Sequence, residues 1–388
     1  MFQSFFLGGF EGSTGYNIHH QWFDQIEATQ HDRFVNEDYA RLQSLGIRAV
    51  REAVRWPLID REKSYDFSSL QPFIEAGKRH GIEIIFDLFH FGYPQHINLF
   101  SDEFPKRFAD YCYAVTRYIS RQIPGRGYYT PVNEPSFFSW AAGEMGLFAP
   151  HKIGRGFELK MQLIKAAIAG IEAIRAANSQ SRMVSVDPLC RVALPPNRPE
   201  MADAVQSFND QSVFQSWDIL SGRLFPELGG SPKHLDIVGI NYYWTNQWEW
   251  GKTGKPLADT DPRRLSLRQL IAIVWERYRT EMLVTETSHV NDMRPVWLNE
   301  MTGEVEAVLN EEIPLRGVCL YPILGMPEWH FRDEWTRLGL WDLVEVEDGL
   351  KRVPFPPMLE AFKAAQRLEN HVEWQKTTHQ KSRSIAYG

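Results

Sequence analysis

The sequence has few cysteines, and their spacing is unlike that of a metal site. Only three occur in 388 residues, namely Cys112, Cys190 and Cys319. An odd count without a Cys-x-x-Cys pair argues against both a zinc site and a disulfide framework. Their neighbours are apolar or mixed, so we expect inert buried thiols.

The chain also lacks an excess of positive charge and any long apolar run. Its net charge is −7 and its pI is about 6.0, which gives no electrostatic basis for binding nucleic acid or an acidic membrane surface. No run has the length of a membrane-spanning helix. Residues 1–9 have no basic region, and Phe5-Phe6-Leu7 is too short for a signal-peptide core. The cytoplasm is therefore the expected location.

Aromatic residues, in contrast, are abundant. They make up 13% of the chain and include 13 tryptophans. One interpretation is a large core, for which the length is ample. The other is that some rings line a carbohydrate cleft and pack on the apolar faces of sugars. Composition does not separate these two interpretations.

Short apolar segments alternate with longer amphipathic ones along the whole chain. Strands are predicted at 4–10, 49–55, 82–89, 128–131, 183–186, 237–241, 282–285 and 317–321. Helices are predicted at 36–45, 70–80, 104–122, 157–178, 201–220, 265–278, 296–310 and 358–367. The first two of these helices end at Gly46 and Gly81, since glycine is a common helix stop. This alternation is typical of parallel βαβ units.

Eight such units predict a (β/α)8 TIM barrel, in the α/β class. The alternative is an open doubly wound sheet, which normally has a GxGxxG loop after its first strand. Residues 8–12 read Gly-Gly-Phe-Glu-Gly and do not fit that motif, so the barrel is favoured. We expect a single barrel domain at 1–368 and a polar C-terminal tail at 369–388.

Two predicted strands end in a glutamate, Glu134 in the fourth and Glu286 in the seventh. A carboxylate at the end of a buried strand is costly unless it has a partner or a task. In a barrel all strand ends of this kind face one mouth. The two acids therefore predict a carboxylate pair, the working part of glycoside hydrolysis. Pro135 predicts an extended backbone at Glu134.

Other strand ends carry polar residues that suit such a pair. Arg51 closes the second strand and would hold a carboxylate ionised. His90 follows the third, where a lone histidine between aromatics is more often a packed residue than a catalyst. Asn241 and Tyr243 close the sixth strand. The loop after them holds three tryptophans at 244, 248 and 250, which predict either local packing or a platform for the leaving group.

Seven segments in collinear order resemble family 1 of the glycoside hydrolases. They lie at 6–9, 51–57, 89–95, 131–135, 239–243, 284–287 and 327–329, the last followed by 337–340. For example, Pro131-Val132-Asn133-Glu134-Pro135 resembles the family's Thr-Leu-Asn-Glu-Pro. The resemblance covers most of the chain and implies a (β/α)8 retaining glycosidase.

The resemblance also implies roles for individual residues. Glu134 would be the general acid/base and Glu286 the nucleophile, about 5–5.5 Å apart and with pKa values shifted in opposite directions. Tyr243 and Arg51 would contact the nucleophile. The expected substrate-binding residues are His90, Asn133, Asn241, Tyr243, Glu328, Trp329, Arg51 and Glu11. In that set Asn133 would bind the sugar 2-hydroxyl, His90 the 3-hydroxyl and Glu328 the far hydroxyls, while Trp329 would support the ring. No metal or organic cofactor is implied.

The sequence departs from the family at several places. The glutamine expected after the first strand is missing, and Glu11 is the candidate substitute, which would alter the choice of sugar. Tyr321 stands where the family has tryptophan, and Thr287-Ser288 where it has Asn-Gly. The chain is also shorter than is usual for the family, which indicates a divergent subgroup.

The predicted function is that of a retaining, exo-acting, β-glucosidase-like β-glycosidase acting on a small-molecule or oligosaccharide β-glycoside. Alternatives are a transglycosylase with the same two glutamates, an endo-β-glycanase, and a sugar-binding relative without turnover. Glu328 and His90 favour a pocket closed around a terminal sugar. The sugar, the linkage and the oligomeric state do not follow from the sequence.

Overall fold

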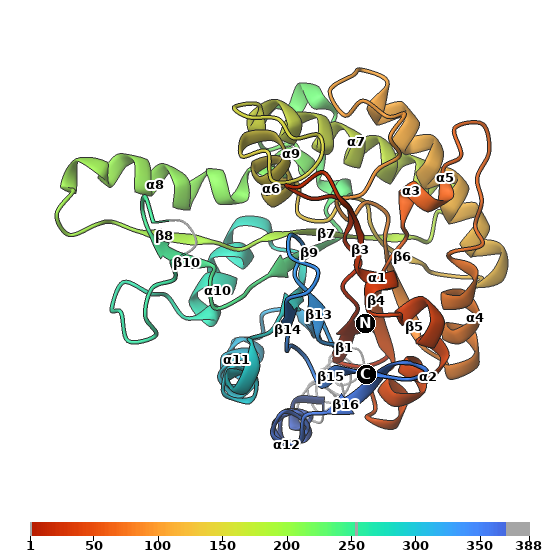
Figure 1. The fold of residues 1–388 in the computed structure, drawn as a ribbon. Coiled ribbons are helices and arrows are strands. Elements are labelled where there is room, and N and C mark those ends of the chain that lie inside the picture. The colour runs from red at the N-terminus through yellow and green to blue at the C-terminus, as the bar shows by residue number, and fades with distance from the viewer. Residues whose placement is uncertain (1, 253–254, 370–388) are drawn as a thin grey trace, which may run out of the picture.

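Eight parallel strands form a closed barrel in the computed structural model, which describes residues 2–252 and 255–369 (Figure 1). Around the barrel the strands follow the order β1-β12-β11-β9-β7-β6-β5-β4. Their bounds are β1 Phe6–Gly9, β4 Ala49–Ala53, β5 Glu83–Asp87, β6 Tyr128–Thr130, β7 Arg182–Pro188, β9 Ile237–Asn241, β11 Glu281–Thr287 and β12 Leu315–Leu320. Each barrel strand overlaps one of the eight predicted from the sequence, so the predicted TIM barrel is confirmed.

The main helices cover the outside of this barrel (Figure 1). They are α2 His31–Ser44, α4 Gln71–His80, α5 Phe104–Gln122, α7 Gly156–Ala177, α10 Leu267–Tyr278, α11 Arg294–Asn310 and α12 Pro356–Ala365. Short helices are α1 Gln25–Ala28, α3 Trp56–Ile59, α6 Pro135–Phe138, α8 Ala202–Asp210 and α9 Gln215–Leu220. Gly46 and Gly81 have φ of 81° and 61°, the left-handed geometry expected of glycine at a helix end.

The single helix predicted at 201–220 is wrong. The segment forms α8, a short 3-10 turn and α9, with a break after Asp210. The Asn209 side chain accepts from the backbone N–H of Val192 and donates to its C=O, at 2.9 Å each. This contact ties the end of α8 to the neighbouring strand β8 (Arg191–Ala193). A tertiary contact of this kind leaves no mark on helical periodicity.

Strand alternation decides which side chains enter the barrel. The barrel interior is filled by a separate cluster that includes Ala49, Ile85, Leu283 and Cys319. Side chains two residues further along the same strands share this inward direction, and they are Arg51, Asp87, Thr285 and Tyr321. The sequence therefore places a polar layer over an apolar one at the carboxyl ends of the strands.

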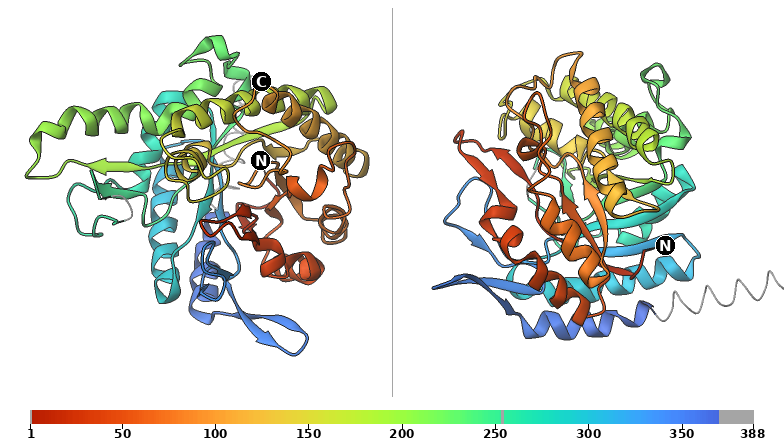
Figure 2. Two further views of the ribbon diagram at one scale, coloured as in Figure 1. Left: turned by 45° about the horizontal axis from the view of Figure 1, so that its top comes forward. Right: turned by 90° about the vertical axis from the view of Figure 1, so that its right-hand side faces the viewer.

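Four two-stranded sheets complete the fold, three of them antiparallel and one parallel. They are β2 Thr14–Tyr16 with β3 Trp22–Asp24, β8 with β10 Gln247–Glu249, β13 Met326–Pro327 with β14 Trp335–Thr336, and β15 Trp341–Val346 with β16 Gly349–Pro354. The β2–β3 hairpin and the blue hairpins after β12 project on the same side of the barrel (Figure 2). Helix α8 with β8 and β10 forms an arm that extends away from the barrel (Figure 1).

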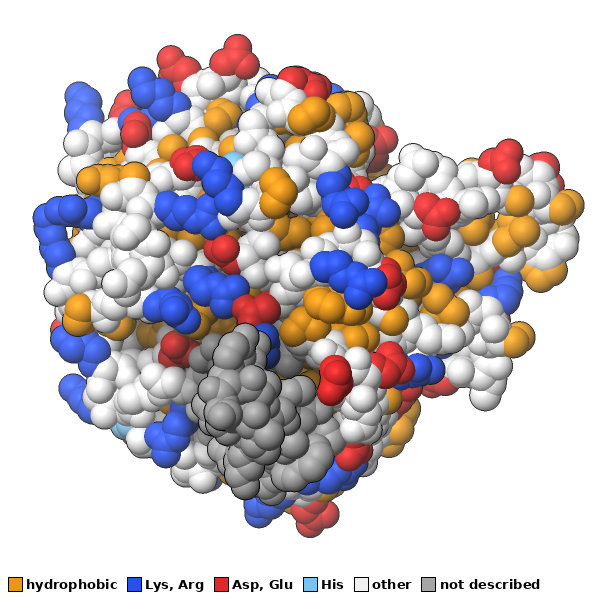
Figure 3. Space-filling view, turned by 180° about the vertical axis from the view of Figure 1, so that it is seen from behind, with side chains coloured by type: hydrophobic (Ala, Val, Ile, Leu, Met, Phe, Trp, Pro, Cys, Tyr) orange, Lys and Arg blue, Asp and Glu red, His pale blue; other side chains and the backbone are white. Residues whose placement is uncertain are grey.

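Charges of both signs are interspersed on the face seen from behind, where the arm projects to the right (Figure 3). Among residues 2–252 and 255–369, no helix combines the length and the apolar character needed to cross a bilayer. Of the tail predicted at 369–388, residues 370–388 lie outside the described residues.

Candidate active site

The Arg51 side chain connects its own strand to three other strands at the carboxyl end of the barrel. It is fully buried on β4. Its Nη1 donates to Glu286 Oε1 at 2.8 Å and to the Thr285 C=O at 2.9 Å. Its Nη2 donates to Asp87 Oδ2 at 2.5 Å and to Asn133 Oδ1 at 3.1 Å. Planar and always charged, the guanidinium orients several acceptors at once.

Glu286 reaches this network because β11 is irregular. Regular alternation would send Glu286 outward with Val284, but the pairing of β11 with β9 shifts register between these two residues. A bulge re-aims a side chain in this way. Glu286 is 4% exposed, and its Oε2 accepts from the Tyr243 hydroxyl at 2.7 Å. Both carboxylate oxygens are thus held by donors, as predicted for Arg51 and Tyr243.

Glu134 lies in a strained turn, not in the extended conformation predicted from Pro135. Its φ and ψ are 48° and 58°, in the left-handed region, and α6 starts at the next residue. Non-glycine residues in that region cost free energy and cluster at functional sites. The Glu134 N–H donates to the Val186 C=O at 3.1 Å, which ties the turn to β7. The prediction failed because the left-handed region is also open to a residue before proline when the surrounding structure holds it.

Asn241 is the hydrogen-bond partner of the Glu134 side chain. Its Nδ2 donates to Glu134 Oε1 at 2.8 Å. Its Oδ1 accepts from the Thr285 hydroxyl at 2.7 Å, which fixes the orientation of the amide. Glu134, which follows β6, therefore accepts a hydrogen bond from a neutral donor, whereas Glu286 accepts one from the positively charged Arg51.

A second chain of hydrogen bonds runs from Arg51 to His90. Because Asn133 Oδ1 accepts from Arg51, its Nδ2 points to His90 Nε2, 3.1 Å away. His90 Nδ1 lies 3.3 Å from Asp87 Oδ2. This arrangement suits the neutral tautomer that carries its proton on Nδ1. Asn133 and His90 are both buried in this network.

Burial raises the pKa of both glutamates, but to different extents. For Glu134, burial and then the charge of Glu286 raise the pKa well above its usual value. Burial also raises the pKa of Glu286, while the positive charge of Arg51 opposes the rise. The two pKa values are thus both raised, and not shifted in opposite directions as predicted. The two glutamates differ because Arg51 is positively charged, and its charge favours the ionised form of Glu286.

The remaining predicted residues lie at the edge of this network. Glu11 is 7% exposed, and its Oε1 is 3.8 Å from His90 Nε2. Glu328 is half-buried and accepts from the Thr336 hydroxyl. Trp329 packs against the rings of Phe91, Phe137 and Phe148. The buried Trp329 Nε1 has no hydrogen-bond partner among the described residues, which leaves one donor unused.

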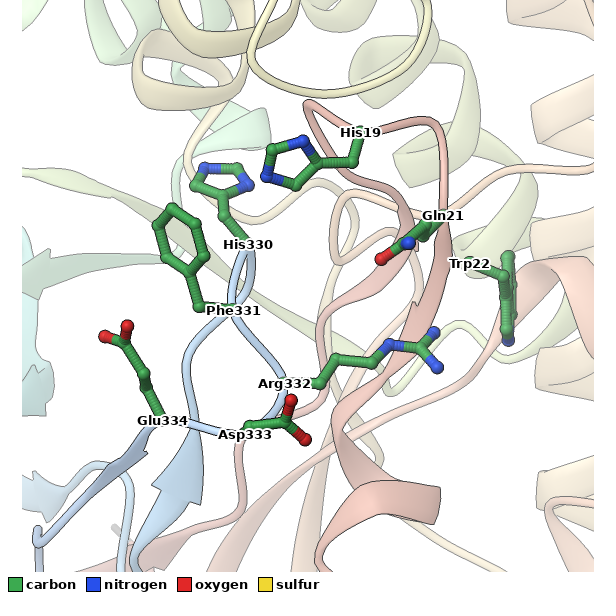
Figure 4. Close-up of a pocket in the computed structure, with 8 residues that line it drawn as sticks. All are labelled: His19, Gln21, Trp22, His330, Phe331, Arg332, Asp333 and Glu334. Carbon is green, nitrogen blue, oxygen red and sulfur yellow. The ribbon is translucent and has the colours of Figure 1, made fainter.

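An open groove of about 830 Å³ lies beside Trp329 (Figure 4). It separates the loop of the β2–β3 hairpin from the segment between β13 and β14. In Figure 4 the rings of His19 and His330 lie next to each other at one end, and Arg332 points toward Gln21. Asn17 connects the two sides, because its Nδ2 donates to the Trp329 C=O at 3.1 Å.

The tryptophan loop after β9 divides into two parts. Trp248 and Trp250 pack on Phe208 in the arm, with ring centroids 5.9 and 6.0 Å away, which supports the packing interpretation for these two. Trp244 stacks on His289 at 4.2 Å, next to the Tyr243 that contacts Glu286.

Within the part of the chain that the structure describes, no three His, Cys, Asp or Glu side chains are arranged to hold a metal ion.

Two buried aspartates of the site escaped the sequence analysis. Asp87 holds Arg51 and His90, and Asp187 at the end of β7 contacts the turn after Glu134. Both interrupt apolar strands, as the two glutamates do. A charge in a buried strand needs a partner or a task, so both aspartates carried a sequence signal of the same kind as the glutamates.

No protein-family model and no curated protein matches the sequence. Solved structures of β-glucosidase from Thermotoga maritima share the fold. The complex with glucoimidazole has a TM-score of 0.76 at 17% identity, and covers 95% of this chain and 98% of that chain. The family 1 β-glucosidase from the same organism has a TM-score of 0.74 at 17% identity, over 93% and 97% of the two chains.

Proposed function

We propose that this chain is a retaining β-glycosidase that removes a terminal β-linked sugar by double displacement. The observation that carries the proposal is the asymmetric pair of buried carboxyls. Glu286 is bound by Arg51 and Tyr243, whereas Glu134 is bound by neutral Asn241. Burial and the charge of Glu286 raise the pKa of Glu134, which suits a proton donor. The β-glucosidases of the same fold support this proposal.

In the first step, a Glu286 oxygen bonds to the anomeric carbon as the bond from that carbon to the leaving oxygen breaks. Glu134 gives its proton to the leaving oxygen, which departs as an alcohol. In the second step, Glu134 takes a proton from water while the water oxygen bonds to the anomeric carbon and releases Glu286. Tyr243 and Arg51 would stabilise the carboxylate of Glu286 before attack and after release.

The sugar would lie among Glu11, His90, Asn133, Glu328 and Trp329. Asn133 donates to His90 in this structure and would share that donor with a sugar hydroxyl. A transglycosylase would use the same residues with an alcohol in place of water. Product analysis by NMR on aryl β-glycosides and β-linked disaccharides separates these activities.

The nucleophile assignment is tested by Glu286→Ala. We expect turnover to fall by at least about a thousandfold, because covalent catalysis is lost. Azide should partly restore the cleavage of an activated aryl glycoside and give the glycosyl azide of inverted configuration. The matched control is Glu134→Ala, for which azide should give the retained configuration. Undiminished hydrolysis by Glu286→Ala would contradict the assignment.

A further inference from the structure

Asp187 is a buried carboxylate behind Glu134 that the proposed reaction does not use. It is fully buried at the end of β7, where alternation turns its side chain away from the barrel interior and toward α6 and α9. The Ser136 N–H donates to Asp187 Oδ1 at 3.0 Å, and the Ser136 hydroxyl donates to Oδ2 at 2.5 Å. The Ser136 hydroxyl oxygen is also 3.0 Å from that of Ser216 on α9.

These contacts fix the turn that carries the acid. Glu134 has left-handed backbone angles, and its own N–H is bound to the Val186 C=O of β7. Two residues later Ser136 is bound, through both its N–H and its hydroxyl, to the next residue of the same strand. The strained turn is therefore clamped to β7 on both sides of Pro135. A left-handed residue persists only when its surroundings hold it in place.

We propose that Asp187 is a positioning residue that clamps the Glu134 turn and, through its negative charge, keeps the Glu134 carboxyl in its acid form. The inference rests on the proposed function for its catalytic meaning. Its structural basis is the pair of hydrogen bonds from Ser136 together with the burial of both carboxyls. In water-excluded surroundings, two nearby carboxyls do not both ionise readily.

Several charged and titratable groups bear on the two carboxyls. Glu134 faces Glu286 of β11, Arg51 of β4, Tyr243 after β9, Cys190 after β7 and Asp187. Burial raises the pKa of Asp187, while the hydrogen bond from Ser136, the positive charge of Lys160 on α7 and the hydrogen bond from Ser216 oppose the rise. Replacing Asp187 by a neutral side chain removes one negative charge and leaves Lys160 less compensated. Both changes favour ionised Glu134.

The test is Asp187→Asn, which keeps the shape of the side chain and one acceptor for the Ser136 N–H. The basic limb of the pH profile of kcat/KM should move to lower pH by about one unit, or about tenfold in rate on that limb. The shift should be large for alkyl glycosides, which need a proton donor, and small for dinitrophenyl glycosides, which do not. The acid limb should stay in place.

Two control variants separate charge from structure. Ser136→Ala removes a hydrogen bond but no charge, so the basic limb should move far less. Asp38→Asn removes a different buried aspartate, which is paired with His31 and Arg352 and has no contact with Glu134 or Asp187 among the hydrogen bonds of the described residues. It should lower stability without moving either limb. A uniform loss of kcat/KM in Asp187→Asn, with both limbs unmoved, would overturn the proposal.

A titration by ¹³C NMR reads the same effect without turnover. With δ-carbon-labelled glutamate, the Glu134 signal is assigned by its absence from Glu134→Gln. Its midpoint should fall in Asp187→Asn and stay in Asp38→Asn. If the unchanged protein hydrolysed no glycoside, the proposed function would fail while this measurement still decided the inference. An unchanged Glu134 midpoint in Asp187→Asn would refute it.

Discussion

At the scale of single residues, the site is specified by which atom donates to which. Arg51 is a donor only, so the Asn133 amide must turn its oxygen toward Arg51 and its nitrogen toward His90. Thr285 and Glu134 orient Asn241 in the same manner. Each amide thus has one orientation that satisfies both neighbours. A substrate hydroxyl entering this layer would meet donors and acceptors that are already fixed.

The acid/base role proposed for Glu134 leads to a prediction about leaving groups. Glu134→Ala should lower kcat/KM for alkyl glycosides and disaccharides by about 10²–10⁴-fold, because their leaving oxygens need a proton. Dinitrophenyl glycosides leave without one, so their first step should be nearly unaffected. Steady-state rates on a series of aryl and alkyl glycosides measure the difference. An equal loss on all substrates would contradict the role.

At the scale of elements, the sequence predicted all eight barrel strands but not the irregularities that make the site. Apolar runs between helices are a strong signal because each strand is buried on both faces. The register shift that turns Glu286 inward and the left-handed turn at Glu134 depend on neighbouring strands β9 and β7. Such features arise from tertiary contacts, so no local sequence pattern predicts them. The family resemblance indicated candidate residues but not these geometries.

Helix α2 and strand β4 are joined by a buried charged cluster around His31. Its Nδ1 is 2.9 Å from Asp38 and its Nε2 is 3.0 Å from Glu52, and Phe10 stacks on the ring at 3.5 Å. Burial opposes the charged form, but Glu52 and Asp38 raise the pKa of His31 to about 9. The folded protein therefore holds this proton more tightly than the unfolded chain does.

This cluster predicts how stability depends on pH. Because the folded pKa lies above the unfolded value of about 6.5, the extra stability is fully present below about pH 6.5. It is lost as pH rises through about 9. The contribution is on the order of 3 kcal/mol at most. Urea unfolding of the protein and of His31→Gln across pH 6–10 measures it, since the free energy difference between them should shrink with rising pH. A free energy difference that does not change with pH would contradict the predicted contribution of the His31 cluster to stability.

At the scale of the whole molecule, most candidate residues lie on or directly after barrel strands, whereas Glu328 and Trp329 lie in the segment between β13 and β14. The hairpins and the arm were not predicted, since their strands lie outside the alternation of strand and helix that indicated the barrel. Their positions follow from contacts such as that of Arg352 in β16 with Asp38 in α2, at 2.9 Å. The loops near the mouth, in contrast, frame the groove beside Trp329.

The extent of the domain predicted at 1–368 can be tested by truncation. Removing residues 370–388 should leave the melting temperature and activity unchanged, because the last turn of the described chain already buries Leu368. Ending the chain at residue 355 should destabilise the protein by several kcal/mol, because α12 buries Met358 and Phe362 in the main core. Calorimetry of both variants checks the boundary. A large loss from the shorter truncation would extend the domain into the tail.

The backbone conformation of Glu134 lowers the stability of the folded protein at a residue that is proposed to carry out chemistry. A left-handed glutamate before a proline costs about 1–3 kcal/mol, which other parts of the fold must offset. Glycine would occupy the same angles without that cost and would lack the carboxyl. A sequence selected only for heat resistance would therefore drift away from glutamate at this position. A glutamate at this position, in spite of that cost, is what the proposed acid/base role requires.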